Sequence, residues 1–331
     1  MPLHDAHYQH WDGVHTGIWT RRWVIAHNGL VACLRNKALR SLMMSCWFGG
    51  LMMAGALFCI GQLLVPESSV ALWVPKMNPN VQAFVRMLTS WLQDHPEISV
   101  GTTQNVLFYY YCVYSLPLSI FALGMALPTL VTRDLASNAI VIYSSKAVTR
   151  GDYLLGKFCT AFGVMAMTWL GPVFFGWFMG NLLAPDWKFF WHARIALVHA
   201  LVFGLCSMVI LCSLALGVSA ISRREKSTPA IWFIWWALGL AIQPIALHTK
   251  PWLRHVGFGY DLRQIGLAVF NLGRDLKTAQ DGIPIFGQFL QGISAETRSA
   301  INDPTIFGAL GGLAIMLIVM ALIIRKRVVP E

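Results

Sequence analysis

Six long stretches of this 331-residue chain contain no Asp, Glu, Lys or Arg, and charged segments separate them from one another. A transmembrane helix needs about 20 consecutive apolar residues, and each stretch is long enough to provide them. The pattern predicts an all-α integral membrane protein with six transmembrane helices. The uncharged stretches are residues 41–66, 98–132, 158–185, 195–222, 227–249 and 304–324.

The stretches and the charged segments together predict how the chain is organised. Residues 1–40 are expected to form a cytoplasmic tail and an amphipathic elbow helix, and residues 41–324 the six-helix transmembrane domain. Within that domain, residues 131–157 form a cytoplasmic loop. Residues 250–303 form an outer loop, whose apolar segments are too short to span and predict re-entrant or interfacial helices. Residues 325–331 form a second cytoplasmic tail. The expected spans are about 42–64, 105–130, 158–184, 195–221, 228–248 and 305–324.

Most of the 25 Lys and Arg residues flank the predicted spans on one side. Short basic segments stay in the cytoplasm, whereas acidic residues contribute little to orientation. We therefore predict that both termini are cytoplasmic. The basic residues on that side are Arg21, Arg22, Arg35, Lys37, Arg40, Arg133, Lys146, Arg150, Lys157, Arg223, Arg224, Lys226, Arg325, Lys326 and Arg327.

Composition disfavours several classes of protein. Hydrophobic residues make up 56% of the chain and charged residues 12%, so the net charge of +10 reports orientation in the membrane, and we expect no nucleic-acid partner. The predicted spans contain no Asp or Glu, which argues against transport driven by protons or sodium ions. All seven cysteines fall in predicted spans or on the cytoplasmic side and lack metal-ligand spacing, so neither an extracellular disulfide nor a metal site is predicted.

Basic and apolar residues alternate at helical spacing just before the first span, over residues 18–40. Such a helix can lie in the membrane surface with its arginines toward lipid phosphates. The alternative is a cytoplasmic cap packed on the other helices. The residues expected at the membrane surface are Trp19, Arg21, Arg22, Trp23, Arg35, Lys37 and Arg40.

Two motifs are considered and set aside. Gly151, Gly156 and Lys157 match a phosphate-binding loop until Phe158, which stands where a magnesium-binding Ser or Thr is required. The sequence Gly-Val-Ser-Ala ending at Ala220 is typical of an intramembrane serine protease. Its serine, however, is predicted at the opposite end of the spans from His248, the histidine near a later span.

The most informative segment is the cytoplasmic loop 131–157. An Arg-Asp pair leaves the second span, an amphipathic stretch follows, and a Thr-Arg…Leu-Leu-Gly-Lys run enters the third span. This loop resembles the first cytoplasmic loop of ABC-2 type transporter permeases, the membrane subunits of ATP-binding-cassette exporters. Asn138 stands where that family often has glycine. The residues that carry the resemblance are Arg133, Asp134, Ser144, Ser145, Lys146, Thr149, Arg150, Asp152, Tyr153, Gly156 and Lys157.

The resemblance implies a permease, partners and a coupling surface, and these are expectations about the whole chain. The permease would form a homodimer or pair with a related permease in lipid, in a prokaryotic plasma membrane. It would not be an enzyme and would hold no cofactor, because a separate ATPase subunit binds ATP and magnesium. The alternatives are a secondary transporter or channel, or a membrane-embedded scaffold. The residues expected to couple to the ATPase are Arg133, Asp134, Leu135, Asn138, Tyr143, Lys146, Arg150 and Asp152.

Overall fold

The computed structural model describes residues 17–65, 68–76, 78–139, 149–248, 250–283 and 295–328. Nearly all of these residues lie in helices, and the described ranges contain no strand. Six of the helices are long and apolar enough to cross a membrane. This confirms the predicted all-α fold and indicates an integral membrane protein.

The six candidate spans follow the six uncharged stretches, but several extend beyond them. The second begins at Pro96, whereas a start near residue 105 is expected from hydropathy, because helical hydrogen bonds continue into polar sequence that hydropathy does not count. In chain order they are α2 (Lys37–Leu63), α5 (Pro96–Leu127) continued by η2 (Pro128–Thr132) and α6 (Arg133–Ala136), α8 (Arg150–Met165) continued by η3 (Ala166–Leu170) and α9 (Gly171–Leu182), α10 (Lys188–Ile221), α11 (Ser227–His248), and α16 (Ile306–Arg327).

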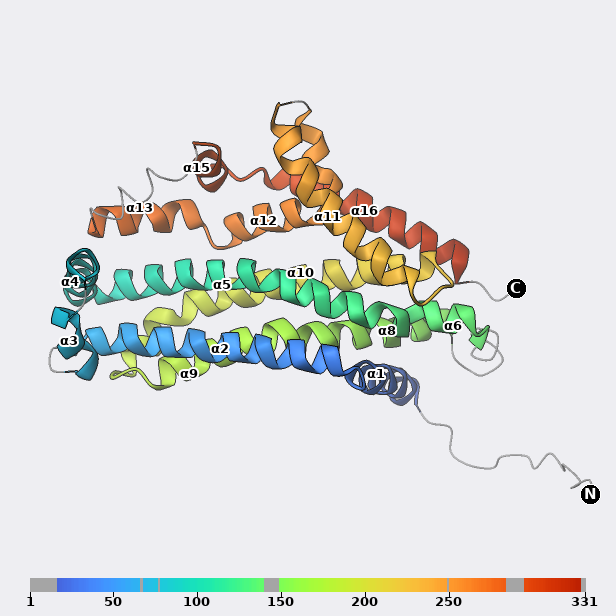
Figure 1. The fold of residues 1–331 in the computed structure, drawn as a ribbon, viewed down its shortest axis with the longest axis horizontal. Helices are drawn as coiled ribbons and strands as arrows, with labels where there is room; N and C mark the ends of the chain where they lie inside the picture. Colours follow the sequence, from blue (N-terminus) through green and yellow to red (C-terminus); the bar gives the residue numbers. More distant parts are fainter. Residues whose placement is uncertain are drawn as a thin grey trace, which may run out of the picture.

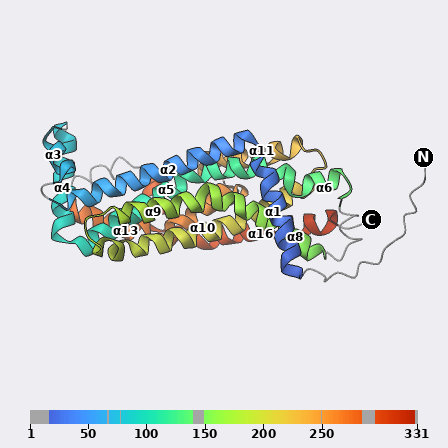
Figure 2. The ribbon, with the colours of Figure 1, turned by 90° about the horizontal axis from the view of Figure 1, so that it is seen from below.

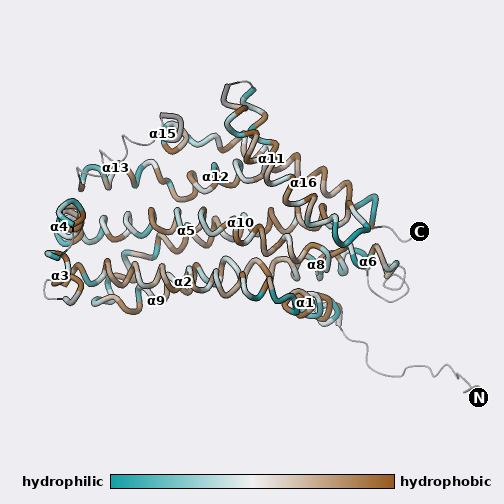
Figure 3. The backbone as a smooth tube through the Cα atoms, in the orientation of Figure 1, coloured by the Kyte–Doolittle hydropathy of each residue, from teal (hydrophilic) through white to brown (hydrophobic). Residues whose placement is uncertain are grey.

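Most of these helices run side by side along the long axis of the molecule (Figure 1). Helix α1 (Ile18–Leu34) instead lies across the bundle, as Figure 2 shows. We call the end that carries α1, α6, the start of α8 and the last turn of α16 the basic end. Helices α3 (Ser69–Trp73) and α4 (Pro79–Asp94) lie at the opposite end. Hydrophobic residues fill the length between the two ends, and hydrophilic residues gather toward them (Figure 3).

In the segment between α11 and α16 the described residues form short helices, and its placement as an outer loop stays a prediction. It contains η4 (Pro251–Val256), α12 (Phe258–Val269), α13 (Leu272–Gly282) and α15 (Ala295–Asn302). Helices α12 and α13 lie along α5, and Phe270 between them packs edge-on against Tyr109 with ring centroids 5.6 Å apart. The segment is therefore packed onto the spanning helices.

Glycines allow α2 and α9 to pack closely. A Cβ atom added to Gly50 would lie 2.7 Å from the backbone oxygen of Pro172, and one added to Gly180 would lie 2.6 Å from the Cβ of Leu57. Nothing lies within 4 Å of a Cβ placed on Gly55. Small residues let helices approach in a membrane, where packing contacts rather than the hydrophobic effect hold them together. Gly50 and Gly180 thus have a packing role that Gly55 lacks.

Candidate functional site

The predicted coupling loop emerges from an irregular end of the second span. After α5, five residues form the π-helix η2, and α6 adds a single turn at Arg133–Ala136. Helix α8 begins at Arg150. Residues 140–148 are outside the described part of the chain, and so are the expected coupling residues Tyr143 and Lys146.

A serine from α10 supports the π-helix. The Oγ atom of Ser219 accepts hydrogen bonds from the backbone N–H groups of Val131 (2.9 Å) and Thr132 (3.1 Å) and donates to the carbonyl oxygen of Leu127 (2.9 Å). Thr132 returns a hydrogen bond to the carbonyl oxygen of Ser219 at 2.8 Å. Unpaired backbone groups are costly in lipid, so this buried serine stabilises the break in α5. Ser219, the serine of the Gly-Val-Ser-Ala sequence, therefore stabilises the backbone of the π-helix.

Asp134 points into the bundle. Its Oδ2 atom lies 2.8 Å from the Nζ of Lys157 and accepts a hydrogen bond from the hydroxyl of Tyr153 at 2.7 Å. Lys157 also donates to the carbonyl oxygen of Thr129 at 3.0 Å. Asp134 is only 8% exposed and Lys157 7%, so the charges are compensated inside the protein. This corrects the expectation that Asp134 offers a polar contact to a partner.

Asp152 holds the start of α8 to α1. Its Oδ1 atom lies 2.5 Å from Nη2 of Arg22, and its Oδ2 atom accepts from the hydroxyl of Thr149 at 2.6 Å. Thr149 caps α8 by accepting from the backbone N–H of Asp152 at 3.2 Å. The expected elbow helix and the expected coupling loop are therefore joined by an ion pair, which neither pattern predicts alone.

The basic segment 18–40 is divided between two helices, whereas one amphipathic helix is expected. Helix α1 ends at Leu34, and Asn36 caps α2 by accepting from the backbone N–H of Ala38 at 3.0 Å. Arg35 follows α1, and Lys37 and Arg40 belong to the first span. Asn36 supplied the signal for this boundary, because Asn is a favoured N-cap residue.

The aromatic residues of α1 face outward. Trp19 is 75% exposed and Trp23 68%, and Arg22 lies over the Trp19 ring with 4.6 Å between Cζ and the ring centroid. Arg21 is half-buried. The opposite side of α1 packs on α8, where a Cβ added to Gly29 would lie 2.4 Å from the Oγ1 of Thr160. Helix α1 is thus packed on the bundle and also presents tryptophans outward, and its position at the membrane surface stays a prediction.

Arg133 and Arg150 remain at the surface. Arg133 pairs with Glu225, in the connection between α10 and α11, with 3.2 Å between Nε and Oε1. Arg150 donates to the backbone oxygen of Ile324, in the last turns of α16, at 2.6 Å. Leu135 is buried, so it does not offer the apolar anchor expected of it.

Asn138 has a backbone φ of 53°, in the left-handed region. Residues with a Cβ rarely adopt this conformation, which glycine adopts freely and asparagine tolerates best. The exposed asparagine thus turns the chain sharply just after α6. We call the exposed residues Arg133, Ala136, Ser137, Asn138, Arg150 and Gly151 the coupling rim.

The coupling rim and the residues beside it contact other parts of the bundle. Of the rim residues, Arg133 pairs with Glu225 in the α10–α11 connection and Arg150 bonds to α16. Beside them, Asp134 pairs with Lys157 of α8, and Asp152 pairs with Arg22 of α1.

A buried acid lies in the segment between α11 and α16, outside the six candidate spans. Asp261 of α12 is fully buried, and its Oδ1 atom lies 2.5 Å from Nδ1 of His255. Its Oδ2 atom has no hydrogen-bond partner in the described part of the chain and would lie 2.7 Å from a Cβ on Gly312. Burial raises the pKa of Asp261 from 3.8 to about 6, although the hydrogen bond from His255 opposes the rise.

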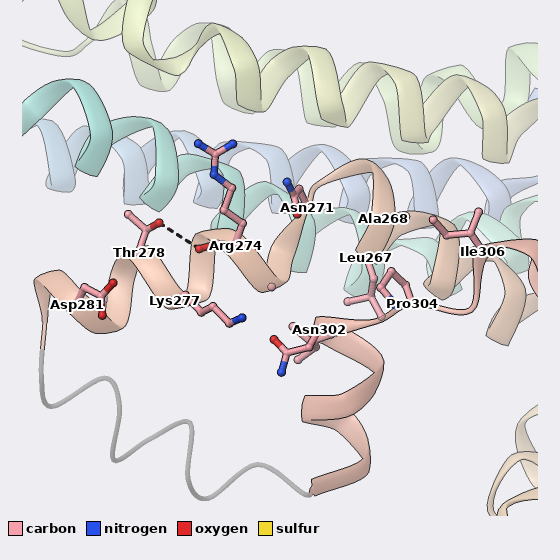
Figure 4. A pocket seen from close by; sticks show the side chains of 12 residues that line it. Leu267, Ala268, Asn271, Arg274, Lys277, Thr278, Asp281, Asn302, Pro304 and Ile306 are labelled. Carbon is pink, nitrogen blue, oxygen red and sulfur yellow. Dashed lines mark hydrogen bonds between the residues drawn. The ribbon is translucent and has the colours of Figure 1, made fainter.

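A cavity of about 530 Å³ lies between α13 and α15. Figure 4 shows Lys277 and Asn302 pointing into this space, whereas Arg274 points away from α15. Thr278 donates to the backbone oxygen of Arg274 at 3.1 Å. Among the described residues no cluster of His, Cys, Asp and Glu could hold a metal ion. One lysine facing an open space does not define a ligand, so we assign none here.

Compared with known proteins, the chain matches no family model and has no significant match among curated proteins.

Proposed function

We propose that the chain is the membrane-spanning permease subunit of an ATP-binding-cassette transporter of the ABC-2 type, acting as an exporter. A separate ATPase subunit, which binds ATP and magnesium, docks on the coupling rim. The functional unit contains two permease halves, from two copies of this chain or from this chain and a related one. It works in the plasma membrane with both termini on the cytoplasmic side, which is the basic end.

One observation carries the proposal. The residues that resemble the family's loop are not scattered: Asp134, Tyr153 and Lys157 form one buried cluster at the end of the second and third spans. Asp152 extends the connection to α1. Residues of an ordinary loop that only set orientation would need no such cluster. The glycine-like conformation of Asn138 is a second point of support, because it occurs where the family often has glycine.

Under this proposal the coupling residues have two different roles. Arg133, Asn138 and Arg150 are exposed and contact the ATPase. Asp134 and Asp152 act as positioning residues, since they fix the rim to α8 and α1. ATP-driven movement of the partner pushes the rim, and the rigid contacts pass that movement to the helices lining the path between the two halves.

The test is co-purification of the tagged chain in mild detergent, with an ATPase assay on the isolated complex. We expect a soluble ATP-binding-cassette subunit with the wild type and its loss with Arg150→Glu. Arg327→Glu is the matched control, because it makes the same charge change at an exposed residue of the basic end. Equal recovery with both variants would contradict the docking site.

Arg133 requires a separate control, since its loss also breaks the exposed pair with Glu225. The double variant Arg133→Glu/Glu225→Arg restores a pair of opposite charges. If Arg133 contacts the ATPase, the double variant still fails to recover the partner. Isolation of the chain as a lone oligomer whose substrate flux persists without any ATPase would favour a secondary transporter or channel, and complex formation without flux would favour a scaffold.

A further inference from the structure

A polar cavity of about 560 Å³ lies between α11, α12 and α15. Binding pockets for small molecules commonly have volumes of about 300–1,000 Å³. Its walls come from the end of α11, from η4, from α12 and from the chain between α15 and α16. The lining residues are Gln243, Pro244, Arg254, Tyr260, Arg263, Gln264, Ser299, Ala300, Asp303 and Thr305.

The charge of the lining is positive. Arg254 and Arg263 line the cavity together with one acid, Asp303, and the other polar groups are amides and hydroxyls. Arg263 also lies close enough to the Tyr109 hydroxyl to interact with it. His255, the neighbour of Arg254, is turned to Asp261 on the other side and does not add to this lining. A cationic pocket of this kind attracts an anion, and the planar guanidinium groups of arginine match phosphate and carboxylate oxygens.

The frame of the cavity is fixed by contacts within the protein. The side-chain oxygen of Gln264 accepts from the backbone N–H of Thr305 at 3.1 Å, and the hydroxyls of Tyr260 and Thr305 are 3.5 Å apart. Arg254 lies over the Tyr260 ring, with 6.0 Å from Cζ to the centroid. Tyr260, Arg263 and Gln264 follow helical spacing on α12, so one face of that helix presents them together.

Apolar surface adjoins this polar cavity. Gln243 belongs to α11, a candidate span on which Leu240 is 48% exposed. Leu240 lies one helical turn before Gln243, on the same side of α11. A cationic cavity that borders an exposed candidate span suits a ligand with a charged head and an apolar tail better than a soluble ion.

We propose that this cavity binds the anionic phosphate headgroup of a membrane amphiphile, with Arg254 and Arg263 holding the phosphate oxygens and Gln243 completing the contact from α11. The ligand's tail lies along the exposed apolar surface of α11. The site does not depend on the proposed coupling to an ATPase, because binding can be measured on the isolated chain.

The experiment measures equilibrium binding to the purified full-length chain in uncharged detergent. The probes are short-chain phosphatidic acid, phosphatidylcholine with the same chains, and inorganic phosphate. We expect phosphatidic acid to bind more tightly than both others and Arg254→Gln/Arg263→Gln to weaken it by about tenfold or more. The control Arg194→Gln removes an arginine that stacks on Trp191, away from the cavity, and should leave binding unchanged.

Each outcome decides the matter. Equal binding of phosphatidic acid and phosphatidylcholine, or an unchanged affinity in the double variant, would overturn the site. Inorganic phosphate binding as tightly as phosphatidic acid would overturn the headgroup assignment in favour of a soluble anion. If the double glutamine variant does not fold, Arg254→Lys/Arg263→Lys keeps both charges but loses the paired donors, and should still show a smaller loss of affinity.

Discussion

The carboxylate of Asp134 and the ammonium group of Lys157 lie 2.8 Å apart, and their side chains are 12% and 9% exposed. Both residues belong to the predicted coupling loop 131–157, and Asp134 lies in the last turn of the second candidate span while Lys157 lies in the third. Their pairing closes the base of the loop, so the coupling rim is held at a fixed position on the bundle.

Removing one partner of this pair should leave an uncompensated charge inside the protein. We expect Asp134→Asn or Lys157→Met to destabilise the chain by about 3–5 kcal/mol, and the double variant to lose less than the sum of the two. Thermal unfolding in detergent measures this. Lys326→Met, which removes an exposed lysine of the basic end, is the control. If the double variant loses as much stability as the two single variants together, the two side chains do not stabilise each other.

Ser219→Ala should weaken the π-helix, because the backbone N–H groups of Val131 and Thr132 then lose their acceptor. We expect a loss of about 1–3 kcal/mol in the free energy of unfolding. The matched control is Ser213→Ala in the same helix, where the hydroxyl donates to the Val209 carbonyl oxygen of its own helix and the residue is half-buried. Equal stability of the two variants would show that Ser219 does not stabilise the π-helix.

Two glycines of α2 should respond differently to the same substitution. Gly50→Ala places a methyl group 2.7 Å from the Pro172 backbone oxygen, so α2 and α9 must separate, at about 1–3 kcal/mol. Gly55→Ala meets nothing within 4 Å and should be neutral or slightly stabilising. The melting temperatures of the two variants test this. Alanine has the higher helix propensity, so propensity cannot cause a loss. A similar loss in both variants would therefore show that the close approach to Pro172 does not set the cost.

Stability should depend on pH through Asp261. Its pKa in the folded protein is raised to about 6 from 3.8, so the folded state holds the proton more tightly than the unfolded state. This contribution is fully present below 3.8 and is lost as the pH rises through about 6. The wild type should therefore gain stability relative to Asp261→Asn when the pH falls from about 7 to about 5.

The measurement is the difference in melting temperature between the wild type and Asp261→Asn across that range. Asp281→Asn serves as the control, because Asp281 is an exposed acid on α13. A difference that stays constant with pH would show that Asp261 does not titrate in this range.

The six spans could be predicted because lipid exposure excludes charge over long, continuous stretches, a signal that needs no knowledge of contacts. The ion pairs between residues of different helices could not be predicted. Asp134 meets Lys157 across the coupling loop, and Arg22 meets Asp152 although 130 residues separate them. The charge pattern alone cannot distinguish a basic residue that orients the chain in the membrane from one that forms a buried ion pair.

Local signals account for part of the remainder. Asn36 and Thr149 are favoured cap residues, and they mark where α2 and α8 begin. Ser219 gave no such signal, because a serine in an apolar helix most often bonds to its own backbone. Its role depends on the π-helix of a different span, which sequence spacing does not reveal.

The docking of α1 sets an order for biosynthesis. Arg22 and the small face around Gly29 have their partners on α8, and Asp152 is synthesised 130 residues after Arg22. At about 5–20 residues per second, the ribosome needs on the order of ten seconds to supply that partner. During this interval α1 lacks its contacts with α8. Its exposed tryptophans, Trp19 and Trp23, suit the predicted position at the membrane surface, where the nascent helix can stay until α8 is synthesised.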